Sequence, residues 1–313
     1  MASQAVSCTT QSEMTQATRN VYEQAARSLG RQIQEGNTSA VRANTVAAVA
    51  AQFDGLAGTI EGVAPDIQQA TLTVDTLYNL NAADLKKGDD QAQFFCSVAG
   101  SALVVTVTIP QLPPGNYVLA VLHATGVAQP QQLSMLLQND PAGSAQWKLA
   151  GLYVRPLTIA GQDGVWYWKQ ARAYAMKKQM WNAYFYYQTA AFLLNPVDFL
   201  SSPNLEKLEK EAQAVRPAEL PGKTPLVVKA VSENLEITGL RAENFAGGLD
   251  LVVNYRAKDV SDPVSTREQI VELMKAMLAL HPELRAAFHG LWVYANHENG
   301  QPFAIELPMN QIQ

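Results

Sequence analysis

The sequence predicts an α+β protein: a curved antiparallel sheet covered by helices, then an aromatic helical hairpin, and last a second small α+β domain. Three observations predict this class. Apolar residues recur every three to four positions near the N-terminus, as on amphipathic helices. From about residue 70 the period falls to two, as in β-strands. The length of 313 residues exceeds one ordinary core and suits two or three domains.

The first helix is expected over residues 12–34, and Gly36 ends it. Its apolar residues share one face, with polar residues between them. They are Met14, Ala17, Val21, Ala25, Leu29 and Ile33. A second helical stretch, rich in Ala and Val, is expected from Thr38 to Gln52. The chain therefore begins with helices and not with the sheet.

Six strands are expected next, in segments rich in β-branched and aromatic residues. Their ranges are 70–80, 91–98, 102–109, 117–124, 132–138 and 146–154. Leu103, Val105, Val107 and Ile109 alternate with period two in the third of them. The PPGN sequence at 113–116 predicts a turn. Helices followed by such a run of strands are typical of an antiparallel sheet with helices on one face.

This element order resembles the nuclear transport factor 2-like (NTF2-like, cystatin-like) superfamily of cone-shaped domains. The likeness covers about residues 12–156 and includes the string FDGL at 53–56 after the helices and WKLAGLY at 147–153 in the last strand. It implies a pocket between the curved sheet and the helices. The superfamily contains isomerases, dehydratases, secretion subunits and non-enzymatic scaffolds, so the fold alone assigns no function.

Enzymes of the resembled superfamily place Asp, His and Tyr around that pocket, which makes Asp54, Asp75, Tyr78 and His123 the catalytic candidates. Asp75 lies among apolar neighbours in LTVDTLYNL, and a carboxylate held against an apolar wall is suited to act as a general base. Alternatively, Asp75 faces solvent on an alternating strand and His123 is a hydrogen-bonded residue at a strand end. Cys96 with His123 is a further candidate nucleophile and base, although a cysteine in QFFCSV is more often a small buried hydrophobe.

Residues 166–196 predict a helical hairpin that holds three of the five Trp and five of the eleven Tyr of the chain. Its Ala and Tyr spacing resembles a single tetratricopeptide unit, with a turn near Lys178 and an end at Pro196. One such unit cannot bury its apolar face alone. The hairpin is therefore expected to pack on another part of the protein or on a partner.

Four tryptophans, Trp147, Trp166, Trp168 and Trp181, are the candidate binding residues. The hairpin rings are interpreted either as core between two domains, which is preferred, or as an exposed platform that stacks on a peptide or carbohydrate. The three hairpin tryptophans cannot all lie on one helical face because they are spaced by two and thirteen residues. At least one is expected to point away from the main seam.

The remainder predicts a second small α+β domain of unassigned family. A short charged helix follows Ser202-Pro203, and a linker covers 220–225. A capping box at 265–268 opens a longer helix that ends at Pro282. Strands are expected at 226–231, 235–240, 249–255, 288–295 and 302–307, the last two as a hairpin. The predicted segments are a flexible N-terminal tether (1–11), the NTF2-like domain (12–156), the hairpin with a bridging helix (157–217) and the C-terminal domain (218–313).

Charge and motifs exclude several classes of function. Charged residues are 16% of the chain, against about 25% in an average soluble domain, and the net charge is -5 without a run of Lys or Arg. A nucleic acid is therefore not expected as a partner. The four histidines lack metal-ligand spacing, and phosphate-loop, dinucleotide and nucleophile-elbow motifs are absent. The sequence predicts no metal site and no cofactor.

The N-terminus suggests a location. Ala5-Val6-Ser7-Cys8 resembles the end of a bacterial lipoprotein processing site, followed by a polar stretch of the kind used as a tether. A natural signal segment is then expected upstream of Met1, with Cys8 as the lipidated residue and the envelope as the location. The alternative is an incidental cysteine and a cytoplasmic protein. Because Cys8 and Cys96 are the only cysteines, one disulfide is left open and a disulfide framework is excluded.

The preferred hypothesis is a non-enzymatic binding or scaffold protein of the bacterial cell envelope, with an unknown small molecule or protein as its partner. Contact with a membrane is expected only through an N-terminal lipid, and a homodimer is left open. The alternative is a small-molecule isomerase or dehydratase with an acid/base pair in the NTF2-like pocket. An enclosed cavity with a desolvated Asp near Tyr78 or His123 would favour the enzyme, and a filled cone would favour the binding protein.

Overall fold

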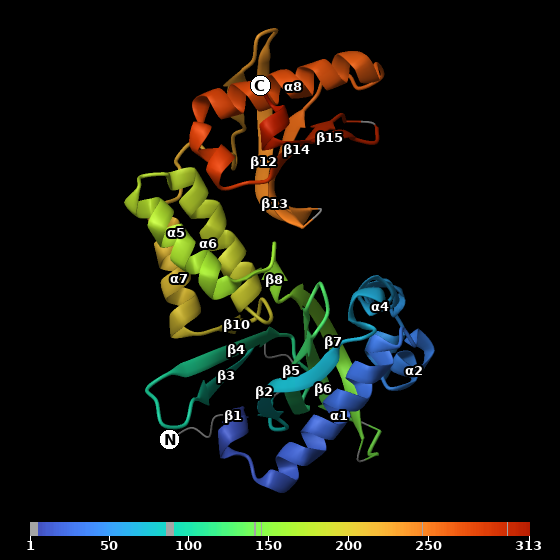
Figure 1. Ribbon diagram of the computed structural model, residues 1–313. Coiled ribbons are helices and arrows are strands. Elements are labelled where there is room, and N and C mark those ends of the chain that lie inside the picture. The colour runs from blue at the N-terminus through green and yellow to red at the C-terminus, as the bar shows by residue number, and fades with distance from the viewer. Residues whose placement is uncertain (1–5, 86–90, 141, 145, 246, 299) are drawn as a thin grey trace. The chain divides into compact units, whose positions relative to one another are not determined.

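The computed structural model describes residues 6–85, 91–140, 142–144, 146–245, 247–298 and 300–313. Internal contacts divide the chain into two units. Unit 1 comprises residues 1–158 and 193–207, and unit 2 comprises residues 159–192 and 208–313 (Figure 1). Both units combine helices with antiparallel strands, which confirms the predicted α+β class.

The main sheet of unit 1 has five strands and is antiparallel throughout. In sheet order they are β1 (Ser7–Thr10), β2 (Thr71–Ala82), β5 (Gly115–Thr125), β6 (Gln131–Asn139) and β7 (Trp147–Pro156). The last four confirm strands predicted from segments rich in β-branched and aromatic residues. β1 was not predicted. The flexible tether expected over residues 1–11 does not hold for residues 7–10, which pair with β2 from Ser7–Asn81 to Thr10–Tyr78; residues 1–5 lie outside the described residues.

Helices cover one face of this sheet (Figure 1). They are α1 (Gln16–Gln34), α2 (Thr38–Ala43), α3 (Ala47–Ala50) and α4 (Asp54–Ile67), and a short 3-10 turn, η1 (Gln11–Glu13), precedes them. α1 confirms the first predicted helix. It begins after Thr15, whose side chain accepts a hydrogen bond from the Thr18 N–H.

Two predictions about these helices were incomplete. The helix expected from Thr38 to Gln52 is divided into α2 and α3, because the intervening backbone pairs with β7: the Val46 N–H donates to the Leu149 carbonyl and the Leu149 N–H to the Asn44 carbonyl. α4 was not predicted, because its sequence contains three glycines and Pro65, which lower helix propensity. Burial of one face of α4 in the core compensates for that cost.

A second sheet of three strands lies on the other face of the main sheet. Its order is β10 (Leu200–Ser201), β4 (Val104–Pro110) and β3 (Gln91–Ser97), all antiparallel. Val107 of β4 and Phe94 of β3 are fully buried in one core with Leu119 of β5, so the two sheets pack face to face. Unit 1 therefore has three layers: helices, main sheet and small sheet.

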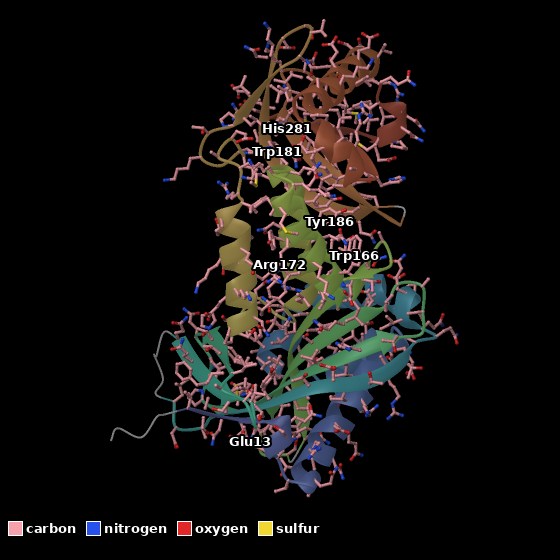
Figure 2. The ribbon with its side chains drawn as sticks, turned by 60° about the vertical axis from the view of Figure 1, so that its left-hand side comes forward. Glu13, Trp166, Arg172, Trp181, Tyr186 and His281 are labelled. Carbon is pink, nitrogen blue, oxygen red and sulfur yellow. A yellow bond between two sulfur atoms is a disulfide. The ribbon has the colours of Figure 1, made fainter. Side chains whose placement is uncertain are left out.

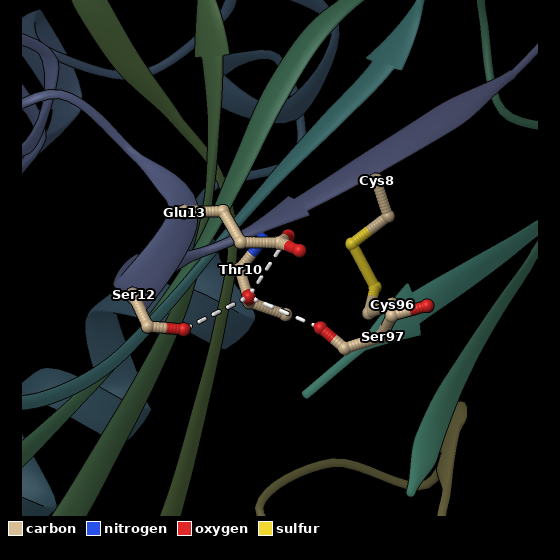
Figure 3. The surroundings of a disulfide bond; sticks show 6 residues. All are labelled: Cys8, Thr10, Ser12, Glu13, Cys96 and Ser97. Carbon is tan, nitrogen blue, oxygen red and sulfur yellow. Dashed lines mark hydrogen bonds between the residues drawn. A yellow bond between two sulfur atoms is a disulfide. The ribbon is translucent and has the colours of Figure 1, made fainter. Parts of the chain in front are cut away.

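A disulfide between Cys8 and Cys96 joins β1 to β3, with a Cα–Cα distance of 5.0 Å (Figure 3). Beside it, the Thr10 hydroxyl donates to the Ser97 carbonyl over 3.2 Å. The Thr10 N–H donates to the Glu13 carboxylate over 3.3 Å. The N-terminal segment is thus fixed to both sheets by a covalent bond and by hydrogen bonds.

The helices after residue 158 confirm the predicted hairpin. A short ribbon of β8 (Thr158–Ile159) and β9 (Gln162–Asp163) precedes α5 (Gly164–Met176) and α6 (Met180–Leu194), and α7 (Pro203–Ala214) follows β10. The hairpin turns at Lys178, which has a positive φ of 60°. The predicted charged helix after Ser202 is α7. Within the described part of the chain, no helix is both long and apolar enough to cross a membrane.

The C-terminal sheet of unit 2 has five strands in chain order: β11 (Leu226–Lys229), β12 (Asn234–Phe245), β13 (Gly248–Arg256), β14 (Gly290–Asn296) and β15 (Phe303–Pro308). β13 and β14 are parallel because α8 (Pro263–Leu280) crosses over between them, and the other pairs are antiparallel. α8 begins at Pro263, since the Asp262 side chain caps it, and not at the capping box expected from Ser265. Two 3-10 turns, η2 (Pro282–Ala286) and η3 (Met309–Gln311), complete the unit.

Candidate functional site

The space between the helices and the main sheet of unit 1, where the resemblance predicts a pocket, contains a continuous apolar core. Ile33 of α1, Ile60 of α4 and Leu122 of β5 are fully buried in it. Residues of β2, β6 and β7 belong to the same core. Close packing of this kind leaves little room for a ligand.

Two of the catalytic candidates meet on the opposite face of the sheet. Thr73 pairs with His123 across β2 and β5, and Asp75 is the extra residue of a β-bulge between Val74 and Thr76. This geometry places an Asp75 carboxylate oxygen 3.8 Å from His123 Nδ1. The structure therefore brings Asp75 and His123 together, but not in the predicted pocket.

The surroundings of this pair are solvated. The Asp75 side chain is 50% exposed and that of His123 27% exposed, so an ion pair there contributes at most about 1 kcal/mol. Burial, and then the charge of Asp75, raise the pKa of Tyr78. His123 Nε2 lies 3.4 Å from the Gln132 amide oxygen. These contacts correspond to the solvent-facing interpretation of Asp75, not to a carboxylate against an apolar wall.

The other candidates on unit 1 lie elsewhere. Asp54 is the exposed first residue of α4, on the helix-covered side of the sheet. Trp147 packs edge-on against Tyr22 with ring centroids 5.0 Å apart, on that same side. Neither joins Asp75 and His123.

The disulfide decides the role of both cysteines. Cys96 is fully buried and bonded to Cys8, so it cannot act as the thiolate of a Cys96–His123 pair. The Cys8 sulfur cannot carry a lipid thioether while it is bonded to Cys96. The disulfide and the predicted lipidation of Cys8 therefore exclude each other.

Trp181 of the hairpin is buried and is not available for stacking on a ligand. Its ring packs on that of His281 with centroids 4.0 Å apart (Figure 2). Its Nε1–H donates to the Glu219 carboxylate over 2.7 Å. That hydrogen bond is the main cause of a lowered pKa of Glu219. Trp166 is half-buried, edge-on to Tyr167 at 5.0 Å.

Trp168 belongs to an ionic network between α5 and α7. Its Nε1–H donates to Glu211 over 2.8 Å, and the Arg172 guanidinium lies 4.7 Å from the centre of the Trp168 ring. Arg172 also donates two hydrogen bonds of 2.7 Å to the Glu211 carboxylate. These bonds lower the pKa of Glu211 to about 2. These contacts with Glu211 and Arg172 give Trp168 a structural role.

An open groove of about 710 Å³ lies on unit 1 beside β4. Its lining comes from β4, β6, β7 and the segment around β10: Thr106, Thr108, Ile109, Pro110, Leu136, Tyr153, Asp198, Phe199, Leu200 and Ser201. The rings of Tyr153 and Phe199 meet edge-on, 5.3 Å apart. At the rim, Arg155 donates to the Asp198 carboxylate and to the Asn195 carbonyl. No sequence motif marks this groove, because its walls are ordinary residues from distant segments of the chain.

A cluster of Asp250, His289 and Glu306 in unit 2 was also missed. Burial raises the pKa of Asp250 above its ordinary value, and the neighbouring His289 opposes that shift. The residues are far apart in the sequence and meet only because α8 makes β14 parallel to β13. A search for histidine spacing alone could not reveal them.

No family model, no curated protein and no solved structure matches this chain. The likeness to the NTF2-like superfamily and to a tetratricopeptide unit therefore stays a prediction.

Proposed function

We propose that the protein is a non-enzymatic binding protein, and that an aromatic or branched aliphatic group of a small-molecule ligand occupies the groove beside β4. One observation carries this proposal. The interior in which an enzyme of the resembled superfamily would hold its substrate contains apolar core, whereas the groove is open to solvent. The alternative isomerase or dehydratase would need a desolvated base, and the side chain of Asp75 is half exposed.

The groove has the chemistry of a ligand site. Its volume falls within the range of about 300–1,000 Å³ of small-molecule pockets. Tyr153, Phe199 and Leu136 supply apolar walls, and the hydroxyls of Thr106 and Thr108 supply a few polar groups. Because one side is open, part of the ligand stays in water, so we expect weak, micromolar binding.

We also propose that unit 1 has an NTF2-like fold. Helices precede a mostly sequential antiparallel sheet and cover one of its faces, which supports a distant likeness to the NTF2-like cone. The strand β1 and the small sheet of β10, β4 and β3 are additions to the expected order.

An extracytoplasmic location is proposed together with this function. The only two cysteines of the chain form a disulfide, and such bonds persist mainly in oxidising compartments outside the cytoplasm. Attachment through a lipid on Cys8 is not part of the proposal, because the same sulfur is bonded to Cys96.

The test is fluorescence titration with N-phenyl-1-naphthylamine, a neutral aromatic probe whose emission rises in apolar surroundings. We expect saturable binding to one site of the native protein. Phe199→Ala should weaken it about tenfold, because loss of ring contact worth about 1.4 kcal/mol corresponds to that factor.

A matched pair of variants locates the site. Thr108→Lys places a charge in the groove and should abolish probe binding. Thr76→Lys, at a similarly half-buried threonine on β2, should leave it unchanged. Absence of saturable binding by the native protein, or equal behaviour of the two lysine variants, would overturn the proposal.

A further inference from the structure

Three residues with metal-binding side chains converge at one end of the C-terminal sheet. Asp250 lies on β13, His289 immediately before β14, and Glu306 on β15. Each offers one ligand atom, and the three atoms all lie within 4.8 Å of one another. His289 Nδ1 is 3.1 Å from an Asp250 carboxylate oxygen. A single small cation can therefore touch all three side chains at once.

One oxygen of each carboxylate lacks a hydrogen-bond partner among the described residues. The side chain of Asp250 is 1% exposed, and its Oδ2 has no hydrogen-bond partner in the part of the chain that the structure describes. Glu306 Oε1 is likewise buried, and no described residue is hydrogen-bonded to it. A buried carboxylate oxygen left without a partner is costly, and such groups are rare in native proteins. Two of them beside one imidazole indicate a missing positive group.

Glycines make room for this convergence. A Cβ atom added at Gly290 would lie 2.9 Å from Glu306 Oε1 and 3.3 Å from Asp250 Oδ1. A Cβ atom at Gly248 would lie 2.6 Å from the Cβ of His289. Any larger residue at either position would therefore push the ligand side chains away.

We propose that Asp250, His289 and Glu306 form a binding site for one divalent transition-metal ion. Two carboxylates and one imidazole are a mixed oxygen and nitrogen set that suits Zn²⁺, Mn²⁺ or Co²⁺ better than Ca²⁺ or Mg²⁺, which prefer oxygen alone. The two carboxylate charges balance the two charges of the ion. Three protein ligands leave positions for water, and His289, 47% exposed, provides the entry from solvent.

The site would act as a clamp on the C-terminal sheet. It ties the final strand, β15, to β13 and to the start of β14, which are its second and first neighbours in the sheet. Because ion binding occurs only in the folded state, it should raise the stability of unit 2. The site lies in the other unit from the groove and is independent of the proposed binding function.

The experiment uses the full, tag-free chain after treatment with a chelator and its removal. Titration with Co²⁺ should give visible absorption bands that saturate at one equivalent, and Zn²⁺ should displace them. The disulfide removes both thiols from competition. Zn²⁺ should also raise the thermal unfolding midpoint.

Isosteric variants test the ligands one at a time. Glu306→Gln and Asp250→Asn should each weaken binding by more than about 100-fold, beyond the roughly 10–100-fold cost of losing an outer partner. The control His297→Gln, a histidine outside the cluster, should bind as the native protein does. If Asp250→Asn does not fold, Glu306→Gln alone tests the site, because Glu306 is only half-buried. The proposal is overturned if neither Co²⁺ nor Zn²⁺ binds at about 100 micromolar. It is also overturned if His297→Gln loses as much affinity as Glu306→Gln and Asp250→Asn.

Discussion

Removing the disulfide should destabilise unit 1 strongly. Cys8 and Cys96 are 88 residues apart, and closing a loop of that length in the unfolded chain corresponds to about 4.6 kcal/mol in the chain-entropy relation. Native disulfides typically contribute about 2–5 kcal/mol, so we expect the double variant Cys8→Ser/Cys96→Ala to lose about 3–5 kcal/mol. Alanine is chosen at position 96 because Cys96 is fully buried, and a hydroxyl there would add a desolvation cost.

Urea unfolding followed at Trp147 measures this loss, since Trp147 is the tryptophan of unit 1 and the other four lie in unit 2. Labelling with 5-fluorotryptophan gives each ring its own ¹⁹F resonance, and Trp147→Phe assigns the relevant one. The native protein with its bridge reduced keeps every side chain and should lose a similar amount. Thr9→Ala, in the same strand, is the control for disturbance of β1. A loss below about 1 kcal/mol in both the double variant and the reduced protein would refute the assigned role of the bridge.

Two further predictions concern unit 2. Tyr186→Phe removes the buried 2.7 Å hydrogen bond from the Tyr186 hydroxyl to the Ala287 carbonyl. The free energy of unfolding, measured with a chemical denaturant, should fall by about 1–2 kcal/mol. The control Tyr184→Phe should lower it by less than about 0.5 kcal/mol, and equal effects of the two variants would contradict this prediction. The hydrogen bonds of Arg172 hold the pKa of Glu211 at about 2, below its ordinary 4.5, so their stabilisation is complete above pH 4.5 and is lost as the pH falls through about 2. Between pH 4.5 and about 2, the free energy of unfolding of Glu211→Gln should therefore fall less steeply than that of the native protein. An unchanged slope would contradict the stabilising role of the network.

Local patterns were sufficient for most strands of unit 1. Val105, Val107 and Ile109 are buried in alternation along β4, as a period of two requires. α4 was not predicted because its glycines and proline have low helix propensity, and tertiary packing stabilises the helix instead. β1 escaped because SCTT is short and polar, and its strand conformation comes from pairing with β2, some 70 residues away in the chain.

The candidate sites were less predictable than the elements. Asp75 and His123 were singled out by residue type, and the strand pairing does bring them together, but only the bulge and the sheet face determine that they are solvated. Asp250 and Glu306 carried no sequence signal, since their meeting depends on the crossover of α8 and on the order of β13, β14 and β15. Residues that meet only through the order of strands in a sheet have no fixed spacing in the sequence, so no sequence motif identifies them.

The most direct measurement of the central claim is the position of a bound probe in a crystal of the native protein. A brominated N-phenyl-1-naphthylamine gives an anomalous signal that locates the ring without interpretation of weak density. The groove proposal predicts a bromine peak beside β4, against the groove-facing sides of Tyr153 and Phe199. A peak within the core between α1 and the main sheet, or beside Asp75 and His123, would contradict it.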